Sequence, residues 1–244
     1  MEISLLTDVG QKRTNNQDYV NHYVNRAGRT MIILADGMGG HRAGNIASEM
    51  AVTDLGVAWV DTQIDTVNEV REWFANNLEM ENKKINQLGQ DEAYKGMGTT
   101  LVIAIKTDDY ILYGNIGDSS GYVVKNEKLH KVTKDHTLVN LLVSTGELTP
   151  EQAKFHPRKN LLTRALGAND PIEIDIFDID NTINGLFLCS DGLTNMVTDE
   201  QIEKVLNSKS SIEEQVEKLI KKSNIRGGTD NISIAYLKKE SGDK

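Results

Sequence analysis

The chain has 244 residues, a length that one large domain can reach, and nothing in its composition marks a linker. Hydrophobic residues make up 39% of it and charged residues 26%, which is ordinary for a soluble globular protein. Its net charge of −9 argues against a nucleic-acid-binding protein, which needs a basic face.

The first half of the chain is predicted to combine short strands with two long helices. Strands are expected at 3–9, 19–24 and 30–35, with a polar loop over 10–18. Helices are expected over 43–60 and 66–89, because apolar residues recur there every three or four positions. Gly89 is expected to cap the second helix at its C-terminus.

The second half is predicted to begin with a meander of strands. These strands are expected at 99–106, 110–116, 121–125 and 128–132. The segment 137–163 is polar and mixed, with a short helix after Thr149 and Pro150. Then come strands at 172–179 and 186–189, helices at 199–206 and 212–222, and a last strand at 231–237.

Tight turns between neighbouring strands imply antiparallel pairing, and the helices fall into two blocks instead of alternating with every strand. This pattern favours an α+β fold over a parallel one. We predict two antiparallel β-sheets packed as a sandwich, flanked by helices on the outside.

Three apolar runs stop on an aspartate: Asp36, Asp118 and Asp191. A fourth, Asp230, stands just ahead of the apolar run 232–237. Strands that end together bring their last residues together, and converging carboxylates repel unless a cation lies among them. Mg²⁺ and Mn²⁺ are divalent cations that prefer oxygen ligands, so the pattern predicts a metal-dependent enzyme. The alternative is that each Asp-Gly pair forms a hairpin turn.

Other catalytic chemistries do not match the sequence. Cys189 lies among apolar neighbours, and position 195 is Asn where a cysteine phosphatase needs Arg, so we interpret Cys189 as an inert core thiol. Serine-hydrolase, phosphate-loop and zinc motifs are missing from the sequence. The glycine-rich turn 36–44 has Arg42 where a dinucleotide fingerprint requires glycine.

Eight short motifs follow one another along nearly the whole chain. They occupy 7–18, 36–41, 98–100, 117–119, 134–136, 156–167, 190–193 and 228–231. In this order they resemble the metal-dependent Ser/Thr protein phosphatase family (the PP2C-like or PPM family), in its compact bacterial form. The resemblance implies a single phosphatase domain over 1–240, with a flap segment at about 138–166 that borders the active site.

The resemblance also implies a set of metal ligands. By matching motif, Asp36 bridges two Mn²⁺ or Mg²⁺ ions, and the Gly37 carbonyl completes one of them. Asp191 and Asp230 hold the other, and Asp18 supports the second ion, largely through water. In this family a hydroxide that bridges the ions attacks phosphoserine or phosphothreonine in line, so no protein nucleophile is required.

Two further roles follow from the resemblance. Asp118 and Asp191 match the ligands of a third, weaker ion, and Arg13 matches the residue that holds the substrate phosphate. An Arg suits that role, because its planar fork of donors fits phosphate oxygens. Without the resemblance, Arg13 would be interpreted as an exposed loop cation.

The sequence departs from the family at two positions. Met38 stands where animal members carry a His proposed as general acid, and the nearby His41 leaves that acid unassigned. Ser120 stands where the family usually has Arg, which supports the alternative of a weakly active enzyme or a pseudo-phosphatase that binds phosphoproteins. A second alternative is a nucleotide-binding or signalling domain that uses the turn 37–44.

The expected setting is the cytoplasm. The single cysteine excludes an internal disulfide, no stretch approaches the roughly 18 apolar residues of a membrane span, and the first residues lack a signal peptide's basic head and cleavage site. The resemblance implies phosphorylated proteins as substrates and a bacterial kinase of the eukaryotic Ser/Thr type as counterpart. We expect no nucleic-acid or membrane partner, and a monomer.

Overall fold

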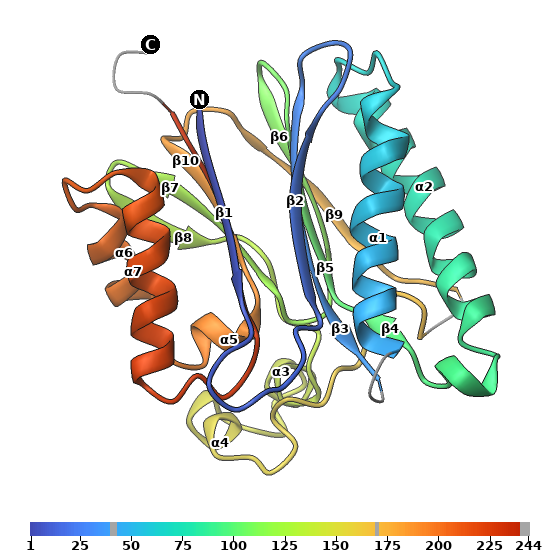
Figure 1. The fold of residues 1–244 in the computed structure, drawn as a ribbon, viewed down its shortest axis with the longest axis vertical. Coiled ribbons are helices and arrows are strands. Elements are labelled where there is room, and N and C mark those ends of the chain that lie inside the picture. The colour runs from blue at the N-terminus through green and yellow to red at the C-terminus, as the bar shows by residue number, and fades with distance from the viewer. Residues whose placement is uncertain (40–42, 169–170, 240–244) are drawn as a thin grey trace.

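The computed structural model describes residues 1–39, 43–168 and 171–239. Two antiparallel β-sheets pack face to face, and helices cover the outer face of each (Figure 1). The predicted α+β sandwich is therefore confirmed. A core of buried apolar side chains fills the space between the sheets. One further core lies between each sheet and the helices that cover it.

One sheet, called the β1 sheet here, joins the two ends of the chain. Its strands run in the order β1 (Glu2–Asp8), β11 (Ile232–Lys238), β10 (Gly185–Cys189), β7 (Ser120–Lys125) and β8 (Lys128–Lys131). Helices α6 (Asp199–Leu206) and α7 (Ile212–Ile225) cover its outer face, with the single turn α5 (Asp191–Thr194) directly after β10.

The other sheet, called the β3 sheet, is built from the middle of the chain. Its strands run in the order β2 (Asp18–Val24), β3 (Thr30–Met38), β5 (Leu101–Lys106), β6 (Tyr110–Ile116) and β9 (Asp175–Asp180), and β4 (Gly98–Thr99) pairs with the end of β3. Helices α1 (Ala43–Val60) and α2 (Val67–Leu88) cover its outer face, and a short turn, η1 (Glu92–Tyr94), follows α2.

The long helix α2 has local signals at both ends. The Thr66 hydroxyl accepts from the Glu69 backbone N–H, and the Glu69 side chain accepts from the Thr66 N–H, which is a capping box. Gly89 caps the other end as predicted, although with φ of −65° it keeps the ordinary right-handed conformation. The cap therefore does not depend on the left-handed conformation that glycine makes accessible.

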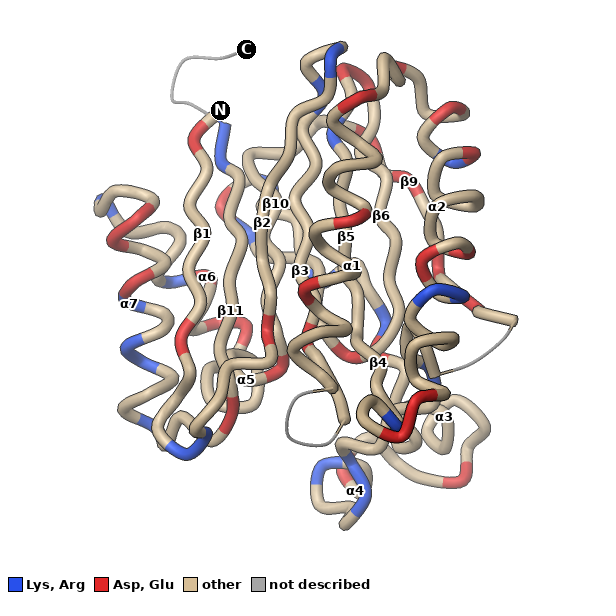
Figure 2. Tube along the Cα trace, turned by 45° about the vertical axis from the view of Figure 1, so that its right-hand side comes forward, with Lys and Arg blue, Asp and Glu red and all other residues tan. Residues whose placement is uncertain are grey.

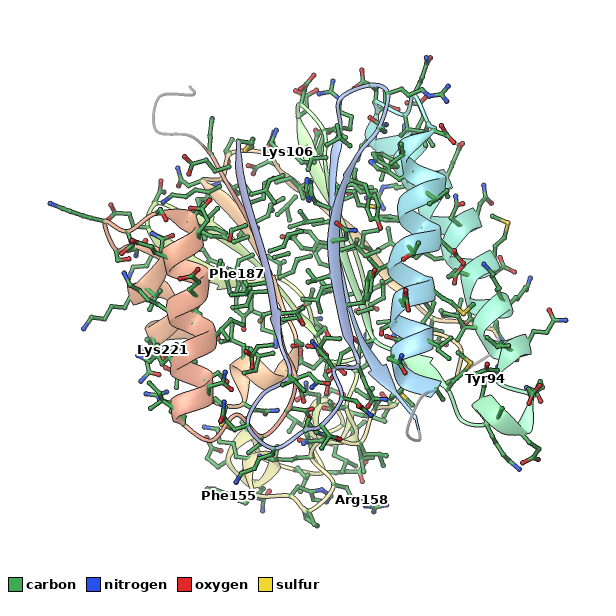
Figure 3. The ribbon with its side chains drawn as sticks, in the orientation of Figure 1. Tyr94, Lys106, Phe155, Arg158, Phe187 and Lys221 are labelled. Atoms are coloured by element: carbon green, nitrogen blue, oxygen red, sulfur yellow. The ribbon has the colours of Figure 1, made fainter. Side chains whose placement is uncertain are left out.

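The segment 138–166 contains two short helices, α3 (Leu138–Ser144) and α4 (Pro150–Lys154), at the end of the sandwich where the β1–β2 loop also lies (Figure 1). Phe155 is 88% exposed, and it projects with Arg158 at this edge (Figure 3). Figure 2 shows Lys and Arg segments around α4 in a molecule whose net charge is −9.

Two expectations about local structure were wrong. The strand expected from 172 begins at Asp175, because Ile172 and Ile174 pack against the α2 core before pairing with β6 starts. The segment 137–163 is also more regular than expected, since α3 precedes the predicted short helix. Among the residues that the structure describes, no helix is long and apolar enough to cross a membrane.

Candidate active site

A polar layer closes one end of the core between the two sheets. In β3, Ile32 and Leu34 face the opposite sheet, and the next residue on that face is Asp36. In β10, Leu186 and Leu188 face inward in the same way, and Ser190 follows at the same spacing. The same change from apolar to polar occurs on other strands, at Thr7, Asp18, Thr100 and Ser233.

Asp18 and Asp36 lie directly opposite each other in the β2–β3 register. The Asp36 N–H donates to Thr100 Oγ1 at 2.9 Å, and the Asp36 carbonyl accepts from the Thr100 N–H at 2.8 Å. Asp36 and Gly37 therefore belong to a paired strand, and the alternative of a hairpin turn is wrong there. A Cβ on Gly37 would stand 2.1 Å from the Gly44 carbonyl oxygen, so only glycine permits this approach of β3 to α1.

A hydrogen bond from the β1 sheet reaches across to Asp18. The Ser190 hydroxyl donates to Asp18 Oδ2 at 2.7 Å, and the Ser190 oxygen in turn accepts from the Ser233 N–H at 2.9 Å. Asp18 is only 6% exposed, so these contacts fix its orientation inside the polar layer. Ser190 had no predicted role, although its place directly before Asp191 was a signal.

Asp191 begins α5, and Asp230 ends the loop before β11. Asn195 Nδ2 donates to Asp191 Oδ2 at 3.0 Å, within the same helical turn. Arg13 Nη2 donates to Asp230 Oδ2 at 2.8 Å, and both side chains are partly exposed. The Asp191-Gly192 pair thus also forms no hairpin turn.

Asn231 attaches the Arg13 loop to this end of β11. Its Nδ2 donates to the Val9 carbonyl at 2.9 Å and to the Asn15 carbonyl at 3.0 Å, while its Oδ1 accepts from the Gln17 N–H at 2.8 Å. All three bonds join positions more than 200 residues apart in the chain. Sequence reasoning assigned Asn231 no role, and its adjacency to Asp230 was the available signal.

Electrostatics show that the predicted acidic residues share one region. Burial raises the pKa of Asp36 well above its usual range, and four neighbouring carboxylates raise it further: Asp18, Asp191, Asp118 and Asp230. Burial is likewise the main cause that raises the pKa of Asp18 and Asp118 to about 7 and that of Asp191 to about 6. Five carboxylates from distant strands and loops therefore repel one another here.

The donor set fits a divalent cation. Asp18 Oδ1 and Asp191 Oδ1 are buried and accept no hydrogen bond, so each has lone pairs directed at no protein donor. Among the described residues, no group of three or more His, Cys, Asp or Glu side chains is arranged so that it could already hold a metal ion. Buried, unsatisfied carboxylate oxygens are the ligands that Mg²⁺ and Mn²⁺ prefer.

The positions that depart from the family pattern lie near this layer. Met38 is half-buried opposite Gly98, and His41 lies outside the described residues. Ser120 is buried on β7, on the same face as Tyr122 and Val124, which contact the helix side, so its side chain faces away from the polar layer. Cys189 is fully buried, and burial raises the pKa of its thiol, in agreement with an inert core residue.

Two face-to-face sheets with a layer of buried carboxylates between their ends are the architecture to which comparisons with known proteins can be set. The family model for protein phosphatase 2C matches residues 9–226. The chain belongs to this family.

Similar proteins cover the chain from end to end. Protein phosphatase PhpP of Streptococcus pneumoniae is 60% identical over 244 residues, which is 100% of this chain and 99% of that protein. The serine/threonine phosphatase stp of Listeria monocytogenes is 42% identical, over 100% of this chain and 98% of its own. The structure of the S. agalactiae serine/threonine phosphatase superimposes with a TM-score of 0.95 at 47% identity, covering 98% of this chain and 99% of that one.

Proposed function

We propose that this chain is a Mn²⁺- or Mg²⁺-dependent protein phosphatase that hydrolyses phosphoserine and phosphothreonine on proteins. The observation that carries the proposal is the polar layer, where carboxylates from both sheets meet and two buried oxygens, Asp18 Oδ1 and Asp191 Oδ1, have no protein partner. Membership in the protein phosphatase 2C family supports the same reaction.

The proposed ligands of the two core ions are the residues that the family motifs match. Asp36 and the Gly37 carbonyl lie at the end of β3, and Asp18 lies opposite on β2. Asp191 begins α5 after β10, and Asp230 lies in the loop before β11. A third, weaker ion is assigned to Asp118 with Asp191. When bound, the ions supply an activated water for in-line attack and neutralise charge on the phosphoryl oxygens.

Arg13 is proposed to bind the substrate phosphate. Its side chain is 51% exposed on the β1–β2 loop, which places its donors where a protein substrate can reach them. It donates to Asp230, so the guanidinium already lies beside a proposed ligand. A fork of N–H donors at this place can orient two phosphate oxygens at once.

The general acid for the leaving alkoxide has no assigned side chain. Met38 has no proton to give, and a protein proton donor is not required if water at the centre protonates the leaving group. Asp118 and Asp191 are proposed as metal ligands, so neither is proposed as the general acid.

The proposal extends to the setting of the enzyme. Residues 1–240 form one phosphatase domain, and the flap 138–166 borders the entry for substrate. The protein acts as a monomer in the cytoplasm, and its counterpart is a bacterial Ser/Thr kinase of the eukaryotic type together with the phosphoproteins that the kinase makes.

The test is hydrolysis of a phosphothreonine peptide by the full chain, with Mn²⁺ and with EDTA. Release of phosphate with Mn²⁺ alone, lost in Asp36→Asn and kept in Asp108→Asn, supports the proposal, since Asp108 is an exposed carboxylate paired with Arg29 at the far end of the β3 sheet. Tight peptide binding without turnover in a single-turnover assay would support the pseudo-phosphatase alternative.

A further inference from the structure

His136 makes backbone and ring hydrogen bonds near the candidate site, and neither the family motifs nor the ligand set assigns it a role. Its backbone N–H donates to the Gly117 carbonyl at 2.8 Å, and its carbonyl accepts from the Thr163 N–H at 2.8 Å. Its ring Nδ1 accepts from the Gly117 N–H at 3.2 Å. One residue therefore binds both main-chain polar groups of Gly117.

The proton on the ring follows from these contacts. Nδ1 faces an N–H donor, so the neutral ring must carry its proton on Nε2. Nε2 lies 3.2 Å from Asp175 Oδ2 and donates to it. Arg164 Nη1 lies 3.5 Å from Nε2 but closer, at 3.3 Å, to Asp175 Oδ1, so the carboxylate receives donors from both side chains. Asp175 on β9 thus fixes the tautomer in which Nδ1 is free to accept.

Gly117 needs to be held, because its backbone is unusual. Its φ is +97°, and a Cβ there would stand 2.6 Å from Thr100 Cγ2, so Thr100 packs against one side while His136 binds the other. The neighbouring Asn115 adds a bond from its Nδ2 to the Lys134 carbonyl at 3.0 Å. The loop 133–137 thereby fixes the whole turn between β6 and β7.

The residue after Gly117 is Asp118, the proposed ligand of the third ion. The direction in which the Asp118 side chain points depends on the Gly117 backbone conformation, because Asp118 is the next residue in the chain. We propose that His136 is a positioning residue: by binding the Gly117 main chain it aims the Asp118 carboxylate at the third metal site. This inference rests on the proposed function, and specifically on the third ion.

Two substitutions separate the two ends of the ring. In His136→Asn the amide oxygen takes the place of Nδ1 and keeps the bond to Gly117, whereas in His136→Gln the longer side chain reaches toward Asp175 and leaves the Gly117 N–H without its acceptor. Both have room, because His136 lines a cavity of about 940 Å³ between α3 and β9. His156→Gln is the matched control, since its Nδ1 accepts only a local N–H, from Arg158 in the flap.

The experiment is a calorimetric titration of the metal-free full chain with Mn²⁺, checked by the free-Mn²⁺ signal in electron paramagnetic resonance. We expect His136→Gln to raise the dissociation constant of the weakest site by about tenfold while the two tighter sites stay unchanged. His136→Asn should raise it by no more than roughly threefold, and His156→Gln should leave it unchanged.

Four results would overturn the inference. Equal weakening in the Asn and Gln variants, an unchanged weakest site in His136→Gln, or a loss of all sites together with a lower melting temperature would each reduce His136 to a structural residue. If the unsubstituted protein binds only two ions, the inference also fails. Hydrolysis of a phosphothreonine peptide by that two-ion protein would nevertheless leave the proposed function in place.

Discussion

Aspartates gather at both ends of the β3 sheet, and the two ends treat their charge in opposite ways. At the hairpin end, Arg29 donates to Asp65 and Asp108, and its guanidinium lowers the pKa of the Asp108 carboxyl. At the other end, burial and like charges raise the pKa of Asp36. The first end carries its own cation, whereas at the second end buried carboxylates repel one another.

The comparison separates two uses of the same side chain. Exposed carboxylates beside a guanidinium need nothing further, because water and the partner both stabilise their charge. Carboxylates that are buried without a partner destabilise the fold. Proteins retain such destabilising groups at sites where ligand binding requires them. The difference in environment, more than the number of aspartates, identifies the polar layer as the candidate active site.

The largest expected effect follows from removing the charge of Asp36. Asp36→Asn should lower Mn²⁺-dependent hydrolysis of p-nitrophenyl phosphate by about a thousandfold, because it removes the proposed bridging ligand. In EDTA the same variant should melt at or above the temperature of the unsubstituted protein, since one repelling carboxylate is gone. Activity within tenfold of the unsubstituted level would contradict the ligand assignment.

A second substitution tests Arg13, whose guanidinium contacts Asp230 at the acidic end. Arg13→Lys should lower kcat/KM for a phosphopeptide by about tenfold, because an ammonium cannot offer two parallel donors to phosphate oxygens. Arg26→Lys is the matched control, since Arg26 is an exposed partner of Asp61 near the Arg29 end. Equal kinetics in the two variants would remove Arg13 from substrate binding.

The third prediction concerns pH. Folding raises the pKa of Asp18 and Asp118 to about 7 and that of Asp191 to about 6, against about 3.9 for an unfolded Asp. The folded state therefore binds more protons than the unfolded state, so the metal-free protein should lose stability as pH rises from about 4 through about 7.

Mn²⁺ should reverse this trend, because an ion bound to the carboxylates stabilises their charged form. At a hundredfold excess over its dissociation constant, one site adds about 2.7 kcal/mol. Melting temperatures at pH 5 and pH 8 in EDTA should differ, with the lower value at pH 8, and Mn²⁺ should narrow that difference. Identical melting temperatures at pH 5 and pH 8 in EDTA would contradict the raised pKa of these carboxylates.

The smallest expected effect lies at the Arg29 end. Arg29→Gln should lower the melting temperature by only a few degrees, since the carboxylates it leaves, Asp65 and Asp108, are exposed and rehydrate easily. Phosphatase activity should stay the same. A loss of Mn²⁺-dependent activity here would show that the two ends are not independent, which circular dichroism of the variant would help to explain.

Much of the fold was predictable because its elements have clear sequence signals. Buried strands such as β3 are short apolar runs, and α2 has apolar residues at three-to-four spacing. Very short elements have too few residues to show a period. The helix α5, with 4 residues, and the strand β4, with 2 residues, were missed for that reason. The start of β9 was misplaced because Ile172 and Ile174 are apolar for packing and not for pairing.

The site was predictable at its carboxylates and less so at their supports. Each apolar run ended on an aspartate, and the structure brings those aspartates into one region. Ser190 and Asn231 were missed because their roles depend on partners from distant segments, at separations that no local pattern encodes. The ligand roles themselves remain predictions until an ion is measured.

The order in which the chain supplies its acidic residues has a consequence for synthesis. Asp18 and Asp36 arrive early on one hairpin, but Asp191 and Asp230 come from the last quarter of the sequence, next to strands of the opposite sheet. A growing chain on the ribosome cannot complete the proposed centre until residue 230 has emerged and both sheets have docked. Truncated chains would therefore lack the proposed centre and would not dephosphorylate cellular proteins.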